Sequence, residues 1–201
     1  MMDKKFNELK EVLEKYGFIV KTFEDGNKAK EELLNEIKID ETVALGGSMT
    51  LQDMGIYEEL KNRGNEVIWH WRKDVESPLQ KAIDTDSYIT STNAITMDGK
   101  LVNMDGTGNR VAAMLFGHKN VYIIVGKNKI CKDYEEARER IRNIAAPLNA
   151  KRLNLSTPCA ITGKCNDCNT PQRICRVETI IHRNPNSCQI HIYLVDEELG
   201  Y

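Results

Sequence analysis

The sharpest chemical feature of the sequence is a group of four cysteines near its C-terminus. Cys159, Cys165, Cys168 and Cys175 have the spacing C-x5-C-x2-C-x6-C within a segment of 17 residues. Four thiolates on a short, turn-rich segment can converge on one centre, as in zinc sites that contain a C-x2-C pair. An iron–sulfur cluster also takes four thiolates, although this spacing matches neither common ferredoxin pattern. The sequence therefore predicts a metal site, zinc or iron–sulfur, at these four residues.

Two other interpretations of the same cysteines stay open. Cys165 and Cys168 would be suitably spaced for a redox pair. Alternatively, the cysteines are simply reduced, and some are buried as small apolar side chains. Three basic neighbours, Lys164, Arg173 and Arg176, are expected to lower thiol pKa values, which agrees with metal binding.

A glycine-bearing loop, Gly46-Gly47-Ser48-Met49-Thr50, stands between a predicted strand and a predicted helix. Glycines let the backbone approach a ligand closely, and free N–H groups at a helix start attract anions. The loop lacks the lysine and glycine spacing of a P-loop, and it is not the dinucleotide fingerprint. We therefore expect Gly46, Gly47, Ser48 and Thr50 to bind a small anion. The alternative is a tight turn in which Ser48 only caps the helix.

A second loop of this kind, Gly106-Thr107-Gly108-Asn109-Arg110, also opens a predicted helix. Arg110 would offer a planar, charged fork to a carboxylate or phosphate group, or else it is an ordinary surface arginine. Because ligands of α/β sheets bind at the carboxyl ends of the strands, both loops are expected to gather there. The sequence thus predicts one anion site built from both loops.

Polar residues between the two loops are further candidates. Asn93, Asp98 and Asp105 would bind a hydroxyl group or hold a proton-transfer group, or they are solvated turn formers. His70 lies between two tryptophans past a strand end, where it faces the cleft or, as the favoured interpretation, packs among aromatic rings. No residue is assigned as catalytic.

The elements that must position these residues follow from hydrophobic periodicity. Helices are predicted at about residues 3–16, 28–37, 51–63, 78–83, 109–116 and 133–148. Strands are predicted at 18–20, 42–45, 66–69, 87–90, 121–126, 177–182 and 189–195. Asp98-Gly99 suits a hairpin turn. The alternation indicates a mostly parallel sheet covered on both faces, in one domain over residues 1–201 with a Cys-rich loop at 157–176.

Composition excludes several classes of function. The 201 residues are 41% hydrophobic and 29% charged, with a net charge of −2, as is ordinary for a soluble globular protein. Without a basic surface, nucleic acid and anionic membranes are not expected as partners. No apolar run approaches the roughly 18 residues of a membrane helix, and the N-terminus does not resemble a signal peptide. A cytoplasmic location is therefore expected, where six cysteines do not favour structural disulfides.

Three blocks of sequence resemble the LUD (lactate utilisation) domain family. They are residues 44–51 (ALGGSMTL) followed by Met54-Gly55, residues 91–95 (STNAI) and residues 106–110 (GTGNR), so the similarity covers about residues 40–130. The resemblance implies a Rossmann-like three-layer α/β sandwich, similar to the sugar-phosphate isomerase and CoA-transferase group, here with a Cys-rich C-terminal extension. It also implies an association with bacterial oxidation of lactate to pyruvate.

The sequence departs from two classes of enzyme with a similar fold. Ribose-5-phosphate isomerases need a glutamate base just after their glycine-rich segment, but here Val111-Ala112-Ala113-Met114 follows. The glutamate nucleophile of CoA transferases is not evident either. Neither activity is therefore expected from this chain.

Two functional hypotheses follow. In the first, the protein binds a small anionic metabolite (lactate, pyruvate or a phosphorylated ligand) as an enzyme or as a subunit of an oxidase complex with other lactate-oxidation subunits. In the second, the cysteine cluster makes it an electron-transfer or scaffold component without turnover of its own. Nucleic-acid binding through a zinc-ribbon-like module ranks last. Exposed aromatic residues near Trp69 and Trp71 would leave room for a homodimer.

Overall fold

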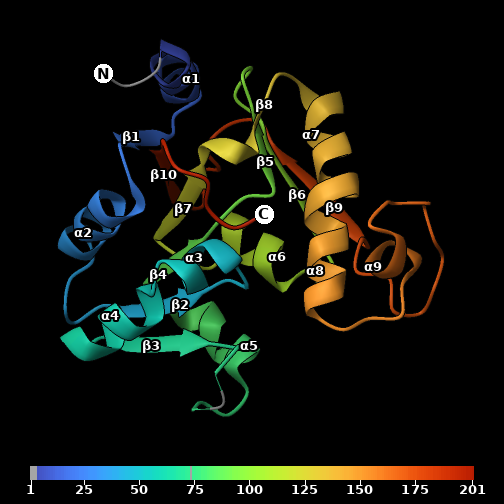
Figure 1. The fold of residues 1–201 in the computed structure, drawn as a ribbon. Coiled ribbons are helices and arrows are strands. Elements are labelled where there is room, and N and C mark those ends of the chain that lie inside the picture. Colours follow the sequence, from blue (N-terminus) through green and yellow to red (C-terminus); the bar gives the residue numbers. More distant parts are fainter. Residues whose placement is uncertain (1–3, 73) are drawn as a thin grey trace.

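A six-stranded sheet forms the centre of the molecule. The computed structural model describes residues 4–72 and 74–201, so Asp3, the predicted start of the first helix, lies outside the described residues. The strand order is β1-β10-β7-β4-β2-β3, and all neighbouring strands are parallel. The strands are β1 (Ile19–Phe23), β2 (Thr42–Leu45), β3 (Glu66–Trp69), β4 (Ser87–Thr90), β7 (Asn120–Gly126) and β10 (Gln189–Val195). Figure 1 shows this arrangement.

A second, smaller sheet packs beside the first. It contains β8 (Ile130–Cys131), β5 (Ala94–Thr96), β6 (Leu101–Asp105) and β9 (Val177–Ile181), in that order. Strands β5 and β6 are antiparallel, and Gly99 in the turn between them has a φ of 86°. Because glycine adopts positive φ without steric cost, the predicted hairpin at Asp98-Gly99 is confirmed.

Helices cover both faces of the central sheet. The α-helices are α1 (Lys4–Lys15), α2 (Gly26–Glu36), α3 (Met49–Asp53), α4 (Ile56–Arg63), α5 (Pro78–Lys81), α6 (Asn109–Leu115), α7 (Tyr134–Arg140), α8 (Ala146–Arg152) and α9 (Pro158–Thr162). The 3-10 turns are η1 (Ala82–Asp84) and η2 (Lys127–Lys129), and η3 (Ile141–Ala145) is a π-helical turn. None of the helices in the described part of the chain has the length and apolar character needed to span a membrane.

Three apolar clusters show how the layers pack. Leu33 of α2, Leu51 of α3 and Leu60 of α4 share a cluster with one face of the central sheet. The other face packs against α1, α6 and the second sheet, and α7 covers the far side of that second sheet. The predicted α/β fold, with a mostly parallel sheet flanked by helices, is therefore confirmed. In addition to the three expected layers, the structure contains the second sheet and helix α7, which covers it.

Two predicted helices are interrupted. The helix expected at 51–63 is divided into α3 and α4 at Gly55, where φ is 67°. The helix expected from residue 133 contains η3 between α7 and α8, and the N–H of Ala146 donates to the carbonyl of Ile141. We attribute this widened turn to Pro147, because a proline inside a helix has no N–H to donate and crowds the preceding turn.

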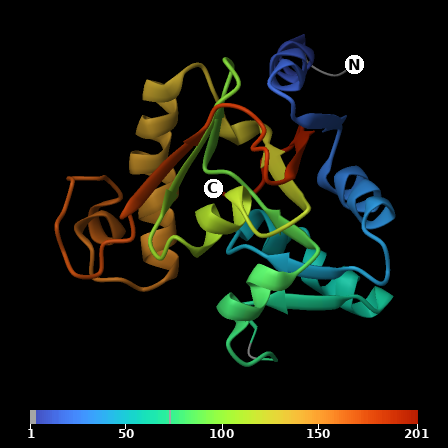
Figure 2. The same ribbon diagram turned by 180° about the vertical axis from the view of Figure 1, so that it is seen from behind.

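The Cys-rich segment at 157–176 is not a C-terminal extension. Strands β9 and β10 follow it, and β10 lies between β1 and β7 in the central sheet. The segment begins with α9, which packs against α8. Figures 1 and 2 show it beside α8, on the side of the molecule opposite α2. The cysteines are therefore carried by a loop within the fold.

Candidate functional site

A cavity of about 390 Å³ opens at the carboxyl edge of the central sheet. Its lining includes residues that lie within three positions of the ends of four parallel strands: Ser48 after β2, His70 after β3, Ser91 after β4 and Lys129 after β7. Ligands of open α/β sheets bind at this edge because the loops there diverge to either face. The position agrees with the one expected from the sequence.

Most of the predicted ligand-binding residues lie on this one cavity. Seven of the eleven line it: Gly47, Ser48, Asn93, Gly106, Thr107, Asn109 and Arg110. The two glycine-bearing loops therefore face a common space, as the topology of parallel strands requires. Ligand binding by these residues stays a prediction.

Two of the other predicted residues, Gly46 and Gly108, have backbone roles. A Cβ atom at Gly46 would lie 2.5 Å from both the Thr90 hydroxyl and the Tyr88 hydroxyl, so close packing at the end of β2 requires glycine. Gly108 has a φ of 90° immediately before α6, a conformation that glycine adopts without strain.

Asp98 and Thr50 also lie off the cavity. Asp98 is exposed in the β5–β6 turn, where its carboxylate accepts a hydrogen bond from Thr96 and pairs with Lys100. This position favours the turn-forming interpretation of Asp98 over a role at the site. Thr50 is fully buried, and its hydroxyl accepts a hydrogen bond from the amine of Lys129 at 2.8 Å.

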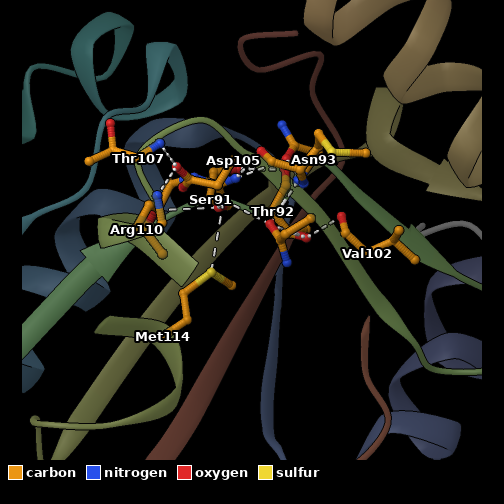
Figure 3. Close-up of polar contacts among 12 residues, drawn as sticks. Ser91, Thr92, Asn93, Val102, Asp105, Thr107, Arg110 and Met114 are labelled. Atoms are coloured by element: carbon orange, nitrogen blue, oxygen red, sulfur yellow. Dashed lines mark hydrogen bonds and ion pairs between the residues drawn. The ribbon is translucent and has the colours of Figure 1, made fainter. Parts of the chain in front are cut away.

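Arg110 is a buried structural arginine. Its guanidinium donates to four oxygen atoms on the β4–β5 loop and on β6: Ser91 O (3.1 Å), Asn103 Oδ1 (2.7 Å), Asn93 Oδ1 (2.9 Å) and Met104 O (2.9 Å). Its Nε lies 3.5 Å from a carboxylate oxygen of Asp105. Figure 3 shows these contacts converging on Arg110. Arg110 is only 8% exposed, so it is not the surface arginine that was one interpretation of the sequence. Its N–H donors are bound to protein oxygens, so its guanidinium is not free to bind an external anion either.

Asp105 supplies the anion that the second loop holds. Its Oδ1 accepts hydrogen bonds from the backbone N–H groups of Thr107 (3.1 Å) and Gly108 (2.9 Å), and Arg110 lies beside its Oδ2. The loop thus has the donor arrangement expected of an anion site. Because a carboxylate of the same chain already occupies those donors, an external anion must find its positive charge elsewhere on the cavity wall.

Lys129 is one of the lining residues that the sequence did not reveal. It is 3% exposed, and its amine donates to the hydroxyls of Thr50 and Ser91, both at 2.8 Å. Among the residues that the structure describes, no carboxylate lies within ion-pair distance of this amine. From the sequence alone, Lys129 and Lys127 are equivalent lysines in a short turn. Only the fold buries one of them and exposes the other.

The environment of Lys129 makes both its charged and its neutral form available near neutral pH. Burial lowers the pKa of Lys129 from 10.5 to about 7, because a charged amine loses hydration in the cavity wall. The positive charges of Arg140 and Arg110 contribute to this lowering of the pKa, while the Asp53 carboxylate opposes it. A lysine of this kind is available at neutral pH both as a cation and as a nucleophile.

The cavity wall also carries an exposed cation and aromatic rings. The Arg152 guanidinium lies 4.4 Å from the centre of the Trp71 ring and donates to the Tyr201 hydroxyl at 3.0 Å. Trp71 stacks on Trp69 at 5.0 Å between ring centres. Trp69 is fully buried and Trp71 is half-buried, so the exposed aromatic surface on which a homodimer was expected is not present there.

His70 completes the cavity wall with a neutral imidazole. Burial lowers the pKa of His70, the Asp105 carboxylate raises it, and Arg152 lowers it, with a net lowering below 6.5. Among the described lining residues, three carry a full or partial positive charge, Arg110, Lys129 and Arg152, and one carries a carboxylate, Asp105. The cavity therefore has the electrostatic character that attracts a small anion.

Cys175 connects the cysteine loop to the cavity. It lines the cavity, and the peptide N–H of the next residue, Arg176, donates to the carbonyl of Asp105 at 3.0 Å. Burial raises the pKa of Cys175 to about 11, and the neighbouring sulfurs of the other three cysteines act in the same direction. The predicted lowering of thiol pKa by basic neighbours is therefore wrong for Cys175, where Arg173 only partly opposes burial.

The four cysteines are free thiols in partly buried positions. The backbone N–H of Asp167 donates to the Cys165 sulfur at 3.4 Å, and Arg173 donates to the carbonyls of Cys168 and Cys175. In the described chain, no group of three or more His, Cys, Asp or Glu side chains is arranged to hold a metal ion. The donor types suit zinc or an iron–sulfur cluster, so this loop would have to close around such a group.

Comparisons with known proteins agree with the fold. The model of the LUD domain family matches residues 6–195. The chain is also similar to the crystal structure of a DUF162 family protein from Deinococcus radiodurans, with a TM-score of 0.56, 9% identity and 96% of each chain covered. DUF162 is the former name of the LUD domain. At this identity the likeness concerns the fold alone, and no curated protein matches the chain.

The first testable consequence concerns Arg110. We expect Arg110→Met to lower the free energy of unfolding by about 3–5 kcal/mol, because it leaves Asp105 and several buried oxygens without their donor. Arg152→Met, which removes an exposed guanidinium, is expected to change it by less than about 1 kcal/mol. Chemical denaturation of both variants measures the difference. Equal stability of the two would contradict the structural role of Arg110.

The second testable consequence concerns Lys129. Its folded-state pKa of about 7 lies below the ordinary 10.5, so the folded protein binds fewer protons than the unfolded chain between these values. We expect Lys129→Met to stabilise the protein by about 1–3 kcal/mol at or below pH 7. The gain is expected to shrink as the pH rises towards 10. Urea denaturation across this range, with Lys127→Met as the exposed control, measures it; a pH-independent difference would exclude a lowered pKa.

Proposed function

Because the chain belongs to the LUD domain family, we propose that it serves lactate utilisation by binding a small anionic metabolite in the cavity at the carboxyl edge of the sheet. The ligand is lactate, pyruvate or a phosphorylated metabolite. The protein acts as an enzyme or as a subunit of an oxidase complex, with other lactate-oxidation subunits as partners. The family is associated with such a role, and the residues of the cavity support the choice of an anion.

One observation carries this proposal, namely the excess of positive charge that the fold itself does not neutralise. Arg110 and Asp105 satisfy each other within the cavity wall. Lys129 and Arg152 form no ion pair with a carboxylate among the described residues, and both line the cavity. A carboxylate or phosphate group would supply the missing negative charge, with charge-assisted hydrogen bonds that are stronger than neutral ones.

The size and polarity of the cavity suit a small metabolite. Its volume of about 390 Å³ falls at the lower end of the range for small-molecule sites, about 300–1,000 Å³. Ser48, Ser91, Thr92 and Asn93 place hydroxyl and amide groups on its wall. These groups would orient a substrate hydroxyl or carbonyl while the basic residues hold its anionic end.

Ligand binding tests the proposal directly. We expect pyruvate, lactate or inorganic phosphate at millimolar concentration to raise the melting temperature, because a ligand that binds only the folded state stabilises it. Arg152→Met is expected to weaken the binding about tenfold, the effect of losing one charge-assisted hydrogen bond.

Lys151→Met is the matched control. Lys151 is exposed, precedes Arg152 on α8 and does not line the cavity, so its replacement should leave binding unchanged. If no anion of the panel gives any stabilisation or calorimetric signal with the unmodified protein, the proposal fails. An equal loss in both variants would indicate a diffuse charge effect in place of a site.

We further propose that the cysteine loop binds zinc or an iron–sulfur cluster, which would make the protein an electron-transfer or scaffold component. Residues 163–176 contain neither helix nor strand, so this stretch can rearrange as metal binding proceeds. The N–H to sulfur contact between Asp167 and Cys165 is of the kind that stabilises thiolate ligands and tunes cluster potentials. Cys175 would place such a group beside the anion cavity.

Elemental analysis and a visible spectrum of anaerobically purified protein test the metal. Brown protein with iron and sulfide supports an electron-transfer role, while zinc alone supports a structural clamp. Cys168→Ser is expected to lose the metal. Cys188→Ser, a cysteine outside the loop, is expected to retain it. Protein that contains no metal, even after anaerobic reconstitution with iron and sulfide or with zinc, would contradict the proposal.

A further inference from the structure

We propose that Lys129 captures a 2-oxo acid covalently, by forming an imine with its carbonyl carbon. The inference rests on the proposed anion-binding function of the cavity and deepens it, because it names the class of ligand and the residue that reacts. The Lys129 amine has two hydrogen-bond acceptors in the protein, Thr50 and Ser91, and its remaining position has none among the described residues.

Two hydroxyl groups fix two of the amine's hydrogens. The Thr50 hydroxyl donates its own hydrogen to the carbonyl of Leu199 at 3.1 Å, so it accepts from Lys129. The Ser91 hydroxyl has the carbonyl of Thr92 as its acceptor at 3.3 Å and likewise accepts from Lys129. Both acceptors are buried parts of the protein wall, so the amine is held in one place.

One position on the nitrogen remains. No other acceptor for Lys129 is present among residues 4–72 and 74–201, and the residue lines the cavity. In the neutral amine that position is a lone pair, which is the nucleophile in attack on a carbonyl. The neutral form is populated near pH 7 because burial and the charges of Arg110 and Arg140 disfavour the ammonium, against the weaker opposing effect of Asp53.

The neighbouring lysine shows that this environment is particular to one residue. Lys127 begins the same 3-10 turn but is exposed, and its amine pairs with the Asp196 carboxylate at 3.0 Å. An exposed, paired ammonium keeps its proton at neutral pH and is a poor nucleophile. Among the described residues that line the cavity, Lys129 is the only lysine.

The same cavity defines the ligand. A molecule that reacts with Lys129 needs an aldehyde or ketone carbon, and one that the cavity attracts needs a negative charge. A 2-oxo acid carries both groups on adjacent carbons. The exposed guanidinium of Arg152 is suited to its carboxylate, since arginine forms paired hydrogen bonds to both carboxylate oxygens.

The reaction is balanced without an oxidant or reductant. The nitrogen lone pair forms a bond to the carbonyl carbon, and a proton passes from nitrogen to the former carbonyl oxygen to give a carbinolamine. The carbon–oxygen bond then breaks as the nitrogen lone pair forms the carbon–nitrogen double bond, and the oxygen leaves as water with that proton and the second proton of the amine. The products are one imine and one water from one amine and one 2-oxo acid. The Ser91 hydroxyl, hydrogen-bonded to Nζ, is placed to relay the proton.

Covalent capture would make the cavity selective for the oxidised acid. A 2-hydroxy acid has the same carboxylate and nearly the same size, but it has no carbonyl carbon for Lys129 to attack. Both acids would bind through their charge, and only the 2-oxo acid would be retained by a bond. Such discrimination is difficult to achieve by packing alone, because the two molecules differ by only two hydrogens.

Reductive trapping with pyruvate and sodium cyanoborohydride at pH 7 tests the proposal. We expect the adduct on the peptide that contains Lys129, identified by mass spectrometry of the digested protein, and no adduct with lactate. Lys129→Met and Lys129→Arg are expected to reduce labelling of the intact chain at least tenfold, whereas Lys127→Met is expected to retain it. Circular dichroism of each variant verifies that it is folded.

The outcomes separate this proposal from the one on which it rests. Calorimetric binding of pyruvate without labelling of Lys129 in the unmodified protein would overturn the imine and leave anion binding intact. Labelling spread over exposed lysines, at equal levels in the unmodified protein and in Lys129→Met, would also overturn it. Absence of both labelling and anion binding would overturn both proposals together.

Discussion

The buried guanidinium of Arg110 is the interaction on which the rest of the site depends. A charge that is removed from water must be paired and hydrogen-bonded, and here the partners come from two separate segments of the chain. The β4–β5 loop and β6 are both tied to this side chain, and Asp105 in turn holds the loop before α6 through two backbone N–H groups. Because these contacts leave little freedom for any one segment, the wall they form is already shaped before a ligand arrives.

This arrangement determines which residues remain for a ligand. Asp105 neutralises Arg110 and accepts hydrogen bonds from the backbone N–H groups of Thr107 and Gly108. The loop at 106–110 therefore has no free donors there for an external anion. The free positive charge lies instead on Lys129, which is buried and held by two hydroxyls, and on Arg152, which is exposed. The Lys129 amine is held in place and shielded from water, whereas the Arg152 guanidinium remains in contact with water, where salt screens its charge. The two basic residues therefore suit different tasks, reaction and attraction.

The fold and the position of the candidate cavity could be predicted from the sequence, because both follow from periodicity and from the rule that parallel strands end at one edge. The hairpin at Asp98-Gly99 followed from turn chemistry. The structural role of Arg110 could not be predicted from the sequence. An arginine whose guanidinium binds protein oxygens and one whose guanidinium binds a ligand can have the same neighbouring residues in the sequence. Lys129 was missed because burial depends on the tertiary fold. The second sheet was missed because β8 is only two residues long and leaves no periodic signal.

The π-helical turn η3 has a geometric consequence for the cavity. An ordinary α-helix advances about 100° per residue around its axis, so one additional residue in a turn rotates everything after it by about that angle. Helix α8 is therefore out of phase with α7, although the two look like one continuous rod. Ile141 and Ala145 within the turn and Asn149 and Arg152 beyond it all line the cavity. The widened turn therefore sets the direction of the end of α8, and a regular helix over the same residues would direct the Arg152 guanidinium elsewhere.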